Sequence, residues 1–483
     1  MIQIKRSRNV SAIAALSTLL LGACTPSLTQ RDLSAGVIVP EAWTAIAERT
    51  DDFGLDGWAA SFEDTELVDL IAMGRERNPD LRTAAARLNQ SKASARVAFA
   101  DRLPTLDAQF TPTRLQSRFT APNGQVGVVR QNNFSLAGNL AWEIDVWGRV
   151  ASNVAAADAD LMASKADLAA AQLSFGANVA RAYFEIVAAS ELSRLAADST
   201  NSFARSLNIV KARYRKGITN ALDVRLAANS LESAKALQVQ RASQKAESQR
   251  RLEVLLGQYP AGLISAAQTL PTLGTAGPTG IPSDLLSRRP DIRAAYVRLA
   301  AADYRVAEAK RNLLPSFQIT GSAGNQTEIF SDFLEFDSLV WRISANVTQP
   351  IFQGGRLKET VKLRQAQADE AVASYAGTLL TAFQEVENAL ANEDFLRERE
   401  AFLKQAVDEA AAATVLAQQQ YSRGLTQILN LLDSQRRELD SRSQLIDIRS
   451  ARVQNRVTLY LALGGPVLPE PTGQTPQEKG AAL

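Results

Sequence analysis

The chain has 483 residues, a formal net charge of +2 from 53 basic and 51 acidic residues, no histidine and one cysteine. This charge balance indicates no polyanion-binding surface, so no nucleic-acid partner is expected. The composition excludes a histidine-based catalytic triad, a zinc site and an internal disulfide framework. The sequence also lacks a P-loop and a glycine-rich dinucleotide motif. We therefore expect no enzyme activity, no metal and no cofactor.

The first residues are typical of an export signal. Basic residues precede an apolar run, Val10–Leu21, which is too short to span a bilayer as a helix. The run ends in Leu21-Gly22-Ala23-Cys24, which resembles the bacterial lipobox. This pattern predicts a signal peptide over 1–23, a covalent lipid (palmitate or a similar acyl chain) on Cys24, and an irregular lipid-anchored segment over 24–64. Thr25, and not an aspartate, follows the cysteine, so by the rule for such lipoproteins we expect sorting to the outer membrane. The alternative is an ordinary signal peptide with a chance cysteine.

The rest of the chain contains two copies of one plan. Asn78-Pro79-Asp80-Leu81-Arg82 recurs as Arg289-Pro290-Asp291-Ile292-Arg293, an offset of 211 residues (290 minus 79). Later landmarks recur at an offset of 207, such as Leu256-Gly257 and Leu463-Gly464 (464 minus 257). Because the landmarks keep their order, we infer a tandem duplication. The first repeat covers 65–257, a linker covers 258–281, the second repeat covers 282–464, and a tail covers 465–483.

Each copy is predicted to fold as a helix, two strands, a very long helix, a tight turn and a returning helix. Alternation of apolar and polar residues predicts strands at about 105–119 and 131–147, and at about 316–325 and 339–352. These stretches have the length of strands that cross a bilayer at a tilt. The segments 121–130 and 325–338 are then the outside loops. A soluble two-sided sheet is the alternative, but Trp142, Trp147 and Trp341 near strand ends favour the membrane.

The long helices are predicted from segments without proline. Val150–Tyr214 and Lys358–Tyr421 contain one glycine each, Gly176 and Gly377. Each would be roughly 95 Å long, which is far longer than a helix of a globular protein. Their apolar stripe is narrow and rich in alanine, which suits a single layer of helices in the wall of a tube. A long solid coiled coil is the alternative.

Four strands per chain cannot close into a barrel, and an open edge cannot face lipid. Closure therefore requires symmetric association, and three chains would give about 12 strands around a lumen. The predicted fold is mainly α: a long antiparallel coiled-coil helical barrel plus a shared transmembrane β-barrel in a homotrimer. The residues expected to line the lumen are polar: Glu143, Asp145, Arg342, Ser344 and Asn346.

Three segments of the sequence resemble the outer-membrane efflux factors (TolC-like, NodT subfamily). These segments are Pro282–Ala295 with Leu314-Pro315-Ser316, Trp142–Arg149 and Gln349–Arg356. The resemblance covers almost the whole chain after Cys24. It implies the outer-membrane channel of a tripartite efflux pump, for passive gated export of drugs or other toxic small molecules from the periplasm. It also implies docking on a periplasmic adaptor (membrane fusion) protein that serves an inner-membrane pump of the resistance-nodulation-division type or similar. The rival interpretation is a structural or adhesive lipoprotein.

The resemblance also implies roles for residues near the two turns that follow the long helices. The turns Gly217-Ile218-Thr219 and Gly424-Leu425-Thr426 would be the periplasmic tips that contact the adaptor. Leu429, Asp433 and Arg436 match the spacing of a periplasmic gate, at which Asp433 would form an acidic ring and favour partial protonation. A solvated helix face is the alternative for these three. Asp223 and Tyr421 match a latch between helices. Asn430 and Thr426 depart from the pattern of relatives, so a second acidic ring and a tight latch are not expected.

Overall fold

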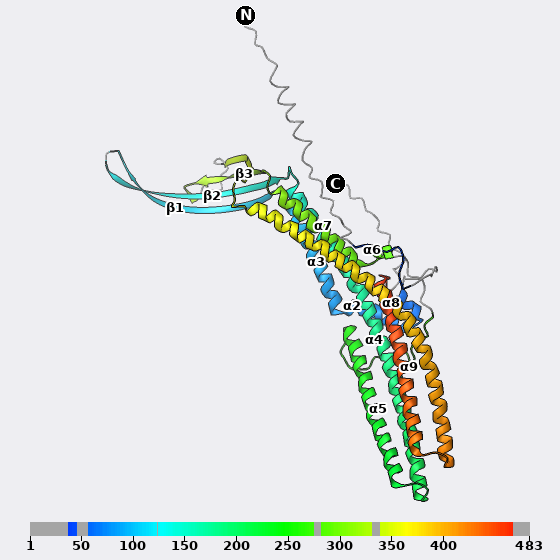
Figure 1. Ribbon diagram of the computed structural model, residues 1–483. Helices are drawn as coiled ribbons and strands as arrows, with labels where there is room; N and C mark the ends of the chain where they lie inside the picture. The colour runs from blue at the N-terminus through cyan, green and yellow to red at the C-terminus, as the bar shows by residue number, and fades with distance from the viewer. Residues whose placement is uncertain (1–36, 46–56, 123, 275–281, 331–338, 467–483) are drawn as a thin grey trace. The chain divides into compact units, whose positions relative to one another are not determined.

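A computed structural model describes residues 37–45, 57–122, 124–274, 282–330 and 339–466. Figure 1 shows that it consists of long helices and one sheet. The predicted signal peptide, the lipidation residue Cys24 and all but two residues of the predicted tail lie outside the described residues. No described helix combines the length and the apolar character needed to cross a bilayer.

Both copies contain the same order of elements. The first copy consists of η1 (Trp58–Phe62), α2 (Thr65–Arg77), α3 (Pro79–Ala100), β1 (Thr105–Thr120), β2 (Val126–Ile144), α4 (Arg149–Arg215) and α5 (Ala221–Leu255). The second copy consists of η2 (Pro282–Asp284), α6 (Leu285–Arg288), α7 (Pro290–Arg311), β3 (Ser316–Thr327), β4 (Leu339–Thr348), α8 (Arg356–Arg423) and α9 (Ile428–Ala462).

Local chemistry sets the helix ends. Prolines 79 and 290 are the first residues of α3 and α7, where a missing N–H costs nothing. Asp64 caps α2 by accepting a hydrogen bond from the N–H of Leu67 at 3.2 Å. At the other end of the long helices, Gly217 and Gly424 have φ of +69° and +78°, the conformation that ends a helix most readily at glycine.

The chain forms two compact units. Of the described residues, the first unit holds 90–162 and 296–376, including the whole sheet, and the second holds 37–89, 163–295 and 377–466. Each unit combines residues of both repeats. The sheet has four antiparallel strands in the order β1-β2-β3-β4.

The core of the second unit gathers around aromatic side chains. Trp58 stacks on Tyr460 with ring centroids 5.2 Å apart, and Phe62 contacts Phe184 at 4.9 Å. A separate cluster near the turns joins α4, α5, α8 and α9 through apolar residues such as Leu207, Leu231, Tyr421 and Leu431. These helices are thus held as two hairpins, α4 with α5 and α8 with α9 (Figure 1).

The strands differ from the predicted ranges by only one or two residues at the ends of β1 and β3, and by more at three other ends. β2 begins at Val126 rather than near 131, because 126–130 pairs with the outer end of β1, where Thr120 faces Val126. The predicted outside loop therefore shrinks to 121–125. β2 ends at Ile144 rather than 147, and β4 ends at Thr348 rather than 352. Within 24–64, which was expected to be irregular, Trp58–Phe62 forms a short 3-10 helix.

Candidate functional site

The two faces of the sheet differ in polarity over the part in which all four strands pair. The pairings of Trp142 with Ile319 and of Ile319 with Ala345 place these residues on one face. The exposed apolar residues of that face include Leu106, Phe110, Trp142, Trp341, Ile343 and Val347. The opposite face carries Glu143, Gln318, Asn346, Ser344 and Arg342. An apolar surface of this extent is unusual in water and typical of the lipid side of a membrane barrel.

Both outer strands of the sheet have a free edge. Within the described residues β1 pairs only with β2, and β4 pairs only with β3. Each free edge presents a row of N–H and C=O groups that need partners. A sheet with one apolar face and two free edges can therefore complete its hydrogen bonding only by pairing with further strands.

Asp145 does not line the polar face as predicted. It follows β2, and its Oδ2 accepts a hydrogen bond from the N–H of Ala151 at 2.7 Å, in the first turn of α4. Trp147 also lies beyond the strand, and its indole N–H donates to the carbonyl of Pro315 at 2.8 Å. The segment that was predicted as the end of a strand is thus a capping turn that begins the long helix.

The turns after the long helices present apolar side chains to solvent. Ile218 and Leu425 are 58% and 72% exposed. In both turns the second residue donates its N–H back to the helix: Ile218 to the carbonyl of Arg213 at 3.0 Å, and Leu425 to that of Gln420 at 2.9 Å. This hydrogen bonding fixes the turn backbone and leaves the apolar tips available for contact with another molecule.

The three gate candidates lie in the first turns of α9. Leu429 is 56% exposed. Both carboxylate oxygens of Asp433 are bound, Oδ1 by Arg436 at 2.8 Å and Oδ2 by Arg437 at 2.7 Å. The hydrogen bond from Arg437, followed by the charges of both arginines, lowers the pKa of Asp433. Within one chain this shift is opposite to the partial protonation expected of an acidic ring, because two guanidinium groups bind the carboxylate.

The latch candidates Asp223 and Tyr421 lie near the turns, but Asp223 accepts its side-chain hydrogen bond from Thr219. A residue that was not predicted joins the two hairpins. The Arg213 guanidinium donates to the carbonyls of Tyr421 at 3.1 Å and Ser422 at 3.4 Å, and it lies 5.0 Å from the ring centre of Tyr421. Arg213 could have been suspected only as a cation in the last turn of a long helix.

Equivalent residues of the two repeats bind the ends of the returning helices. Asn78 is 2% exposed, and its Nδ2 donates to the carbonyl of Leu255 at 2.8 Å. Its counterpart Arg289 is 8% exposed and donates to the carbonyl of Ala462 at 3.1 Å. Arg289 also binds Asp291 and Glu385, at 2.7 and 2.6 Å. The duplicated motif thus holds the C-terminal end of α5 next to the start of α3, and that of α9 next to the start of α7.

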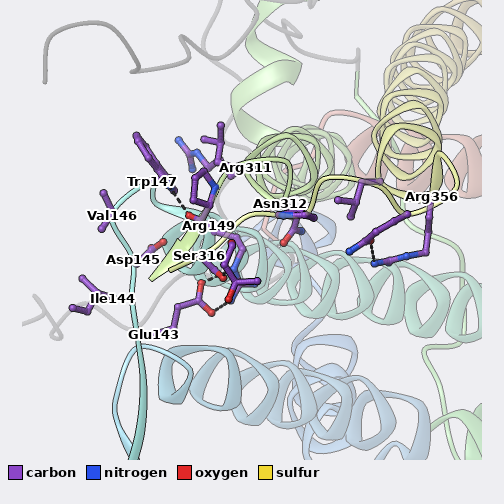
Figure 2. A pocket seen from close by; sticks show the side chains of 16 residues that line it. Glu143, Ile144, Asp145, Val146, Trp147, Arg149, Arg311, Asn312, Ser316 and Arg356 are labelled. Atoms are coloured by element: carbon purple, nitrogen blue, oxygen red, sulfur yellow. Dashed lines mark hydrogen bonds and ion pairs between the residues drawn. The ribbon is translucent and has the colours of Figure 1, made fainter. Parts of the chain in front are cut away.

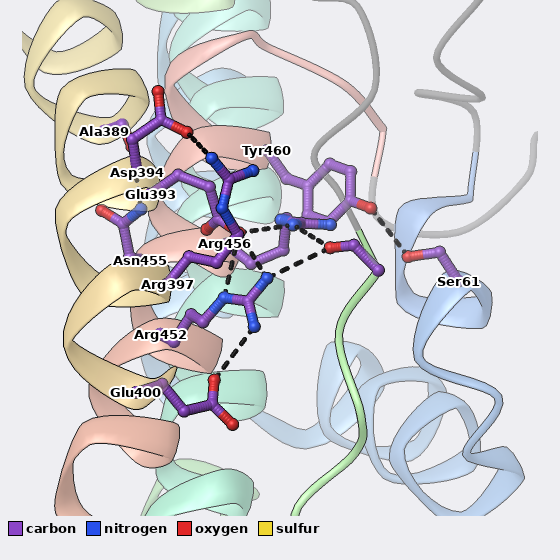
Figure 3. Close-up of polar contacts among 11 residues, drawn as sticks. Ser61, Ala389, Glu393, Asp394, Arg397, Glu400, Arg452, Asn455, Arg456 and Tyr460 are labelled. Atoms are coloured by element: carbon purple, nitrogen blue, oxygen red, sulfur yellow. Dashed lines mark hydrogen bonds and ion pairs between the residues drawn. The ribbon is translucent and has the colours of Figure 1, made fainter. Parts of the chain in front are cut away.

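A buried ion-pair cluster joins α8 to α9 (Figure 3). Glu393 is 1% exposed, and its Oε1 accepts hydrogen bonds from Arg452 at 3.1 Å and Arg456 at 2.9 Å. Arg452 also binds Glu400 at 3.0 Å, and Arg456 donates to the carbonyl of Gly274 at 3.0 Å. The cluster therefore also holds the linker between the repeats against α9.

Glu253 holds the beginning of the same linker. Its carboxylate accepts hydrogen bonds from the N–H groups of Gly262, Leu263 and Ile264 at 2.6, 2.7 and 3.1 Å. Burial alone would raise the pKa of Glu253, but these three hydrogen bonds outweigh it and the pKa is lowered. The ionised carboxylate therefore stabilises the linker.

Known proteins share this arrangement. A family model described as outer membrane efflux protein matches residues 70–258 and 281–465. The chain is 32% identical to outer membrane protein OprJ of Pseudomonas aeruginosa over 470 residues, 95% of this chain and 96% of that one. It is 30% identical to the pyoverdine export outer membrane protein OpmQ of the same species over 465 residues, 95% of this chain and 97% of OpmQ.

Solved structures agree. The outer-membrane channel OprN superposes with a TM-score of 0.83 at 28% identity, covering 89% of this chain and 97% of OprN. The CmeC outer membrane channel of Campylobacter jejuni gives 0.82 at 25% identity, covering 90% and 92%. The family match, together with the apolar sheet face and the paired helical hairpins, identifies the molecule: the chain belongs to the outer membrane efflux protein family and acts as an efflux channel.

Proposed function

We propose that three copies of this chain form one gated export duct, anchored by a lipid on Cys24 and docked on a periplasmic adaptor protein of an inner-membrane pump. The observation that carries the trimer is the four-stranded sheet with one apolar face and two free edges. Pairing β1 of one copy with β4 of the next would satisfy both edges, and three copies would enclose a lumen with about 12 strands.

The test of the duct is a measurement of trimer mass combined with planar-bilayer conductance of the full-length protein. We expect a trimer that resists dissociation without heating and that forms discrete channels. A protein that is monomeric, or that stays silent in the bilayer even as Asp433→Ala, would refute the gated duct and favour an adhesive lipoprotein.

We place the gate at Leu429, Asp433 and Arg436 on α9. Three copies of this helix face around an axis would bring these side chains together. Because Asp433 binds two guanidinium groups, Asp433→Ala would free two positive charges per chain and increase repulsion across the opening. We therefore expect a larger conductance from Asp433→Ala than from the parent protein.

A matched control exists on the same helix. Glu438 pairs with Arg442 at 2.6 Å, an interaction of the same kind one turn later. Glu438→Ala should leave the conductance unchanged. Equal conductance of Asp433→Ala and the parent would refute this position for the gate, while the trimer and the barrel would still stand.

The turn residues at 217–219 and 424–426 are proposed to contact the adaptor. Their support is the exposure of Ile218 and Leu425 on turns with a fixed backbone. A photo-crosslinking residue placed at either position should capture a periplasmic coiled-coil protein, whereas the same residue at Leu363, an exposed position on α8 in the other compact unit, should not. Equal capture of that protein from a tip position and from Leu363 would contradict docking at the tips.

The latch is proposed to involve Arg213 as well as Asp223 and Tyr421, because Arg213 makes the described contacts between the hairpins. Asn430 in the first turn of α9 donates to Thr426 in the preceding turn at 2.8 Å, so these two departures from the family pattern bind each other. For the anchor, radiolabelled palmitate should appear in the parent protein and be absent from Cys24→Ala. Label that persists in Cys24→Ala would contradict lipidation at this residue.

A further inference from the structure

The hairpin of β1 and β2 continues beyond the four-stranded part of the sheet (Figure 1). β3 pairs with β2 over 134–144 only, whereas β1 and β2 pair with each other as far as Thr120 and Val126. The residues 113–120 and 126–133 therefore form a two-stranded extension. It lies at the end of the strands remote from α3 and α4, because β1 follows α3 and β2 leads into α4. In the proposed duct this end faces the outside of the cell.

The face that is apolar in the four-stranded part continues into this extension. Successive side chains of a strand alternate between faces, so the even-numbered residues of β2 share the face of Trp142. Over 134–144 these residues are apolar: Ile144, Trp142, Leu140, Gly138, Leu136 and Phe134. This range is as long as a tilted strand that crosses a bilayer, roughly 9–11 residues. The next positions on this face therefore lie at the level of the lipid headgroups on the outer side.

Three exposed arginines occupy this face of the extension. Arg130 lies directly opposite Gln116 in the register, and its Nε donates to the Oε1 of Gln116 at 2.8 Å. Arg114 and Arg118 lie two residues before and after Gln116, and hence on the same face. Diagonal neighbours across an antiparallel pair are about 7–8 Å apart. The three guanidinium groups therefore form one patch, centred on Arg130.

The described part of this face contains no carboxylate. The acids of the two strands, Asp107 and Glu143, belong to the opposite face, and Glu328 contacts Gln131 of that face at 3.3 Å. Pairing of β1 with β4 of a neighbouring copy would add no acid, since β4 contains none. It would also leave the side chains on both faces uncovered, because strands pair through their edges. The positive charge of the patch is therefore not balanced by the strands around it.

An arginine at the inner end of the same sheet shows the contrast (Figure 2). Arg149 binds both carboxylate oxygens of Glu143, at 2.8 and 2.7 Å. Within the described residues, Arg114 and Arg118 have no side-chain hydrogen bond or ion pair, and Arg130 binds only a neutral amide. The fold thus uses the inner arginine as one half of an ion pair and leaves the outer three available to an anionic ligand.

We propose that Arg114, Arg118 and Arg130 bind the phosphate groups of lipids in the outer leaflet of the membrane. Guanidinium groups bind phosphate through paired, charge-assisted hydrogen bonds. The apolar residues next to the patch on the same face, such as Phe134, would contact the acyl chains of the same lipid. The proposal rests on the proposed duct only in that the apolar face lies in the membrane, and it needs neither the gate nor the adaptor.

The experiment measures equilibrium binding of fluorescent diphosphoryl lipid A to the purified full-length protein in a neutral detergent. Arg114→Gln, Arg118→Gln and Arg130→Gln should each weaken binding by about fivefold, and the triple variant by about a hundredfold, since each arginine near a lipid headgroup contributes a similar share. Arg342→Gln is the matched control, because Arg342 is an exposed arginine of the same sheet on the opposite face. It should change the affinity by less than about twofold.

A second probe tests the role of the phosphates. Lipid A without phosphates should bind the parent as weakly as diphosphoryl lipid A binds the triple variant, and inorganic phosphate at the concentration of the lipid should not displace it. The proposal is refuted if the parent binds both lipids equally, if the triple variant binds as tightly as the parent, or if Arg342→Gln weakens binding as much as Arg118→Gln. Displacement of the lipid by inorganic phosphate would also refute it, in favour of a site for a free anion.

The trimer mass of the same samples separates this proposal from the duct. A triple variant that remains trimeric and conducts ions, but has lost affinity for diphosphoryl lipid A, has lost only the lipid contact, as we expect. A trimeric, conducting parent that does not distinguish the two lipids refutes the lipid contact and leaves the duct intact. A monomeric parent refutes the duct itself.

Discussion

Gly257→Ala should locally destabilise the end of α5 through two separable effects. Gly257 has φ of +70°, a conformation that costs an alanine about 1–2 kcal/mol. A β-carbon there would also lie 2.8 Å from the carbonyl oxygen of Arg77, the last residue of α2. Because that oxygen belongs to backbone and cannot rotate away, the contact adds about 1–3 kcal/mol. The expected total is about 2–5 kcal/mol.

Gly217→Ala is the control for the first effect. Gly217 has nearly the same φ, +69°, but a β-carbon there meets no atom within 4 Å. Amide hydrogen exchange, read by mass spectrometry at each turn, measures both local losses. We expect exchange at the Gly217 turn to accelerate by roughly tenfold, and exchange at the ends of α5 and α2 by roughly a hundredfold or more in Gly257→Ala. Equal acceleration in the two variants would refute the steric argument and leave backbone conformation as the whole explanation.

Three further predictions concern side chains. Glu393→Gln should lower stability by about 3–5 kcal/mol, because the buried Arg456 loses its carboxylate partner while Arg452 keeps Glu400. Thermal unfolding in detergent should therefore begin at a lower temperature, and an unchanged onset temperature would contradict a structural role. Because the pKa of Glu253 is lower in the folded chain than in the unfolded chain, its carboxylate contributes its full stabilisation of the linker above the unfolded-state pKa. This contribution is lost as the pH falls through the folded-state pKa. Amide protection at 262–264 should therefore decline between about pH 5 and pH 3, and Glu253→Gln should already lack it at pH 7. Arg213→Met should accelerate amide hydrogen exchange at 420–425, because the contact with Tyr421 is lost, and should leave exchange at the end of α5 unchanged. Unchanged exchange near Tyr421 would show that the contact between the hairpins is not stabilising.

The sheet faces could be predicted from sequence because alternation is a local property of an extended chain. Alternation assigned Trp142 and Ile319 to the apolar sides of their strands, and the register pairs the two residues on one face. The start of β2 could not be predicted, since 126–130 contains a glycine and is a strand only through its pairing with β1. The end of β2 was wrong for a related reason: Asp145 continues the alternation, yet its carboxylate serves as a cap for α4.

The partners in the charged clusters could not be predicted from local sequence patterns. Glu393 and Arg452 are distant in sequence, on two helices whose relative register follows from packing. Asp433 was singled out by resemblance, but the resemblance included only one of its two arginine partners, and Arg437 changes the expected charge of the site. Sequence spacing places residues on a helix face, while the charge of that face depends on every neighbour.

The equivalence of Asn78 and Arg289 has a consequence for how the two repeats diverged. Arg289 binds Glu385, whose counterpart 207 residues earlier is Asn178, and Asn178 lines the same surface pocket as Asn78. One repeat therefore uses two amides where the other uses an ion pair. We expect these two positions to change together, because Arg289 shares its hydrogen bonds between Glu385 and Asp291, and only Asp291 has a charged counterpart in the first repeat, Asp80. Asn78→Arg should therefore be better tolerated together with Asn178→Glu than alone.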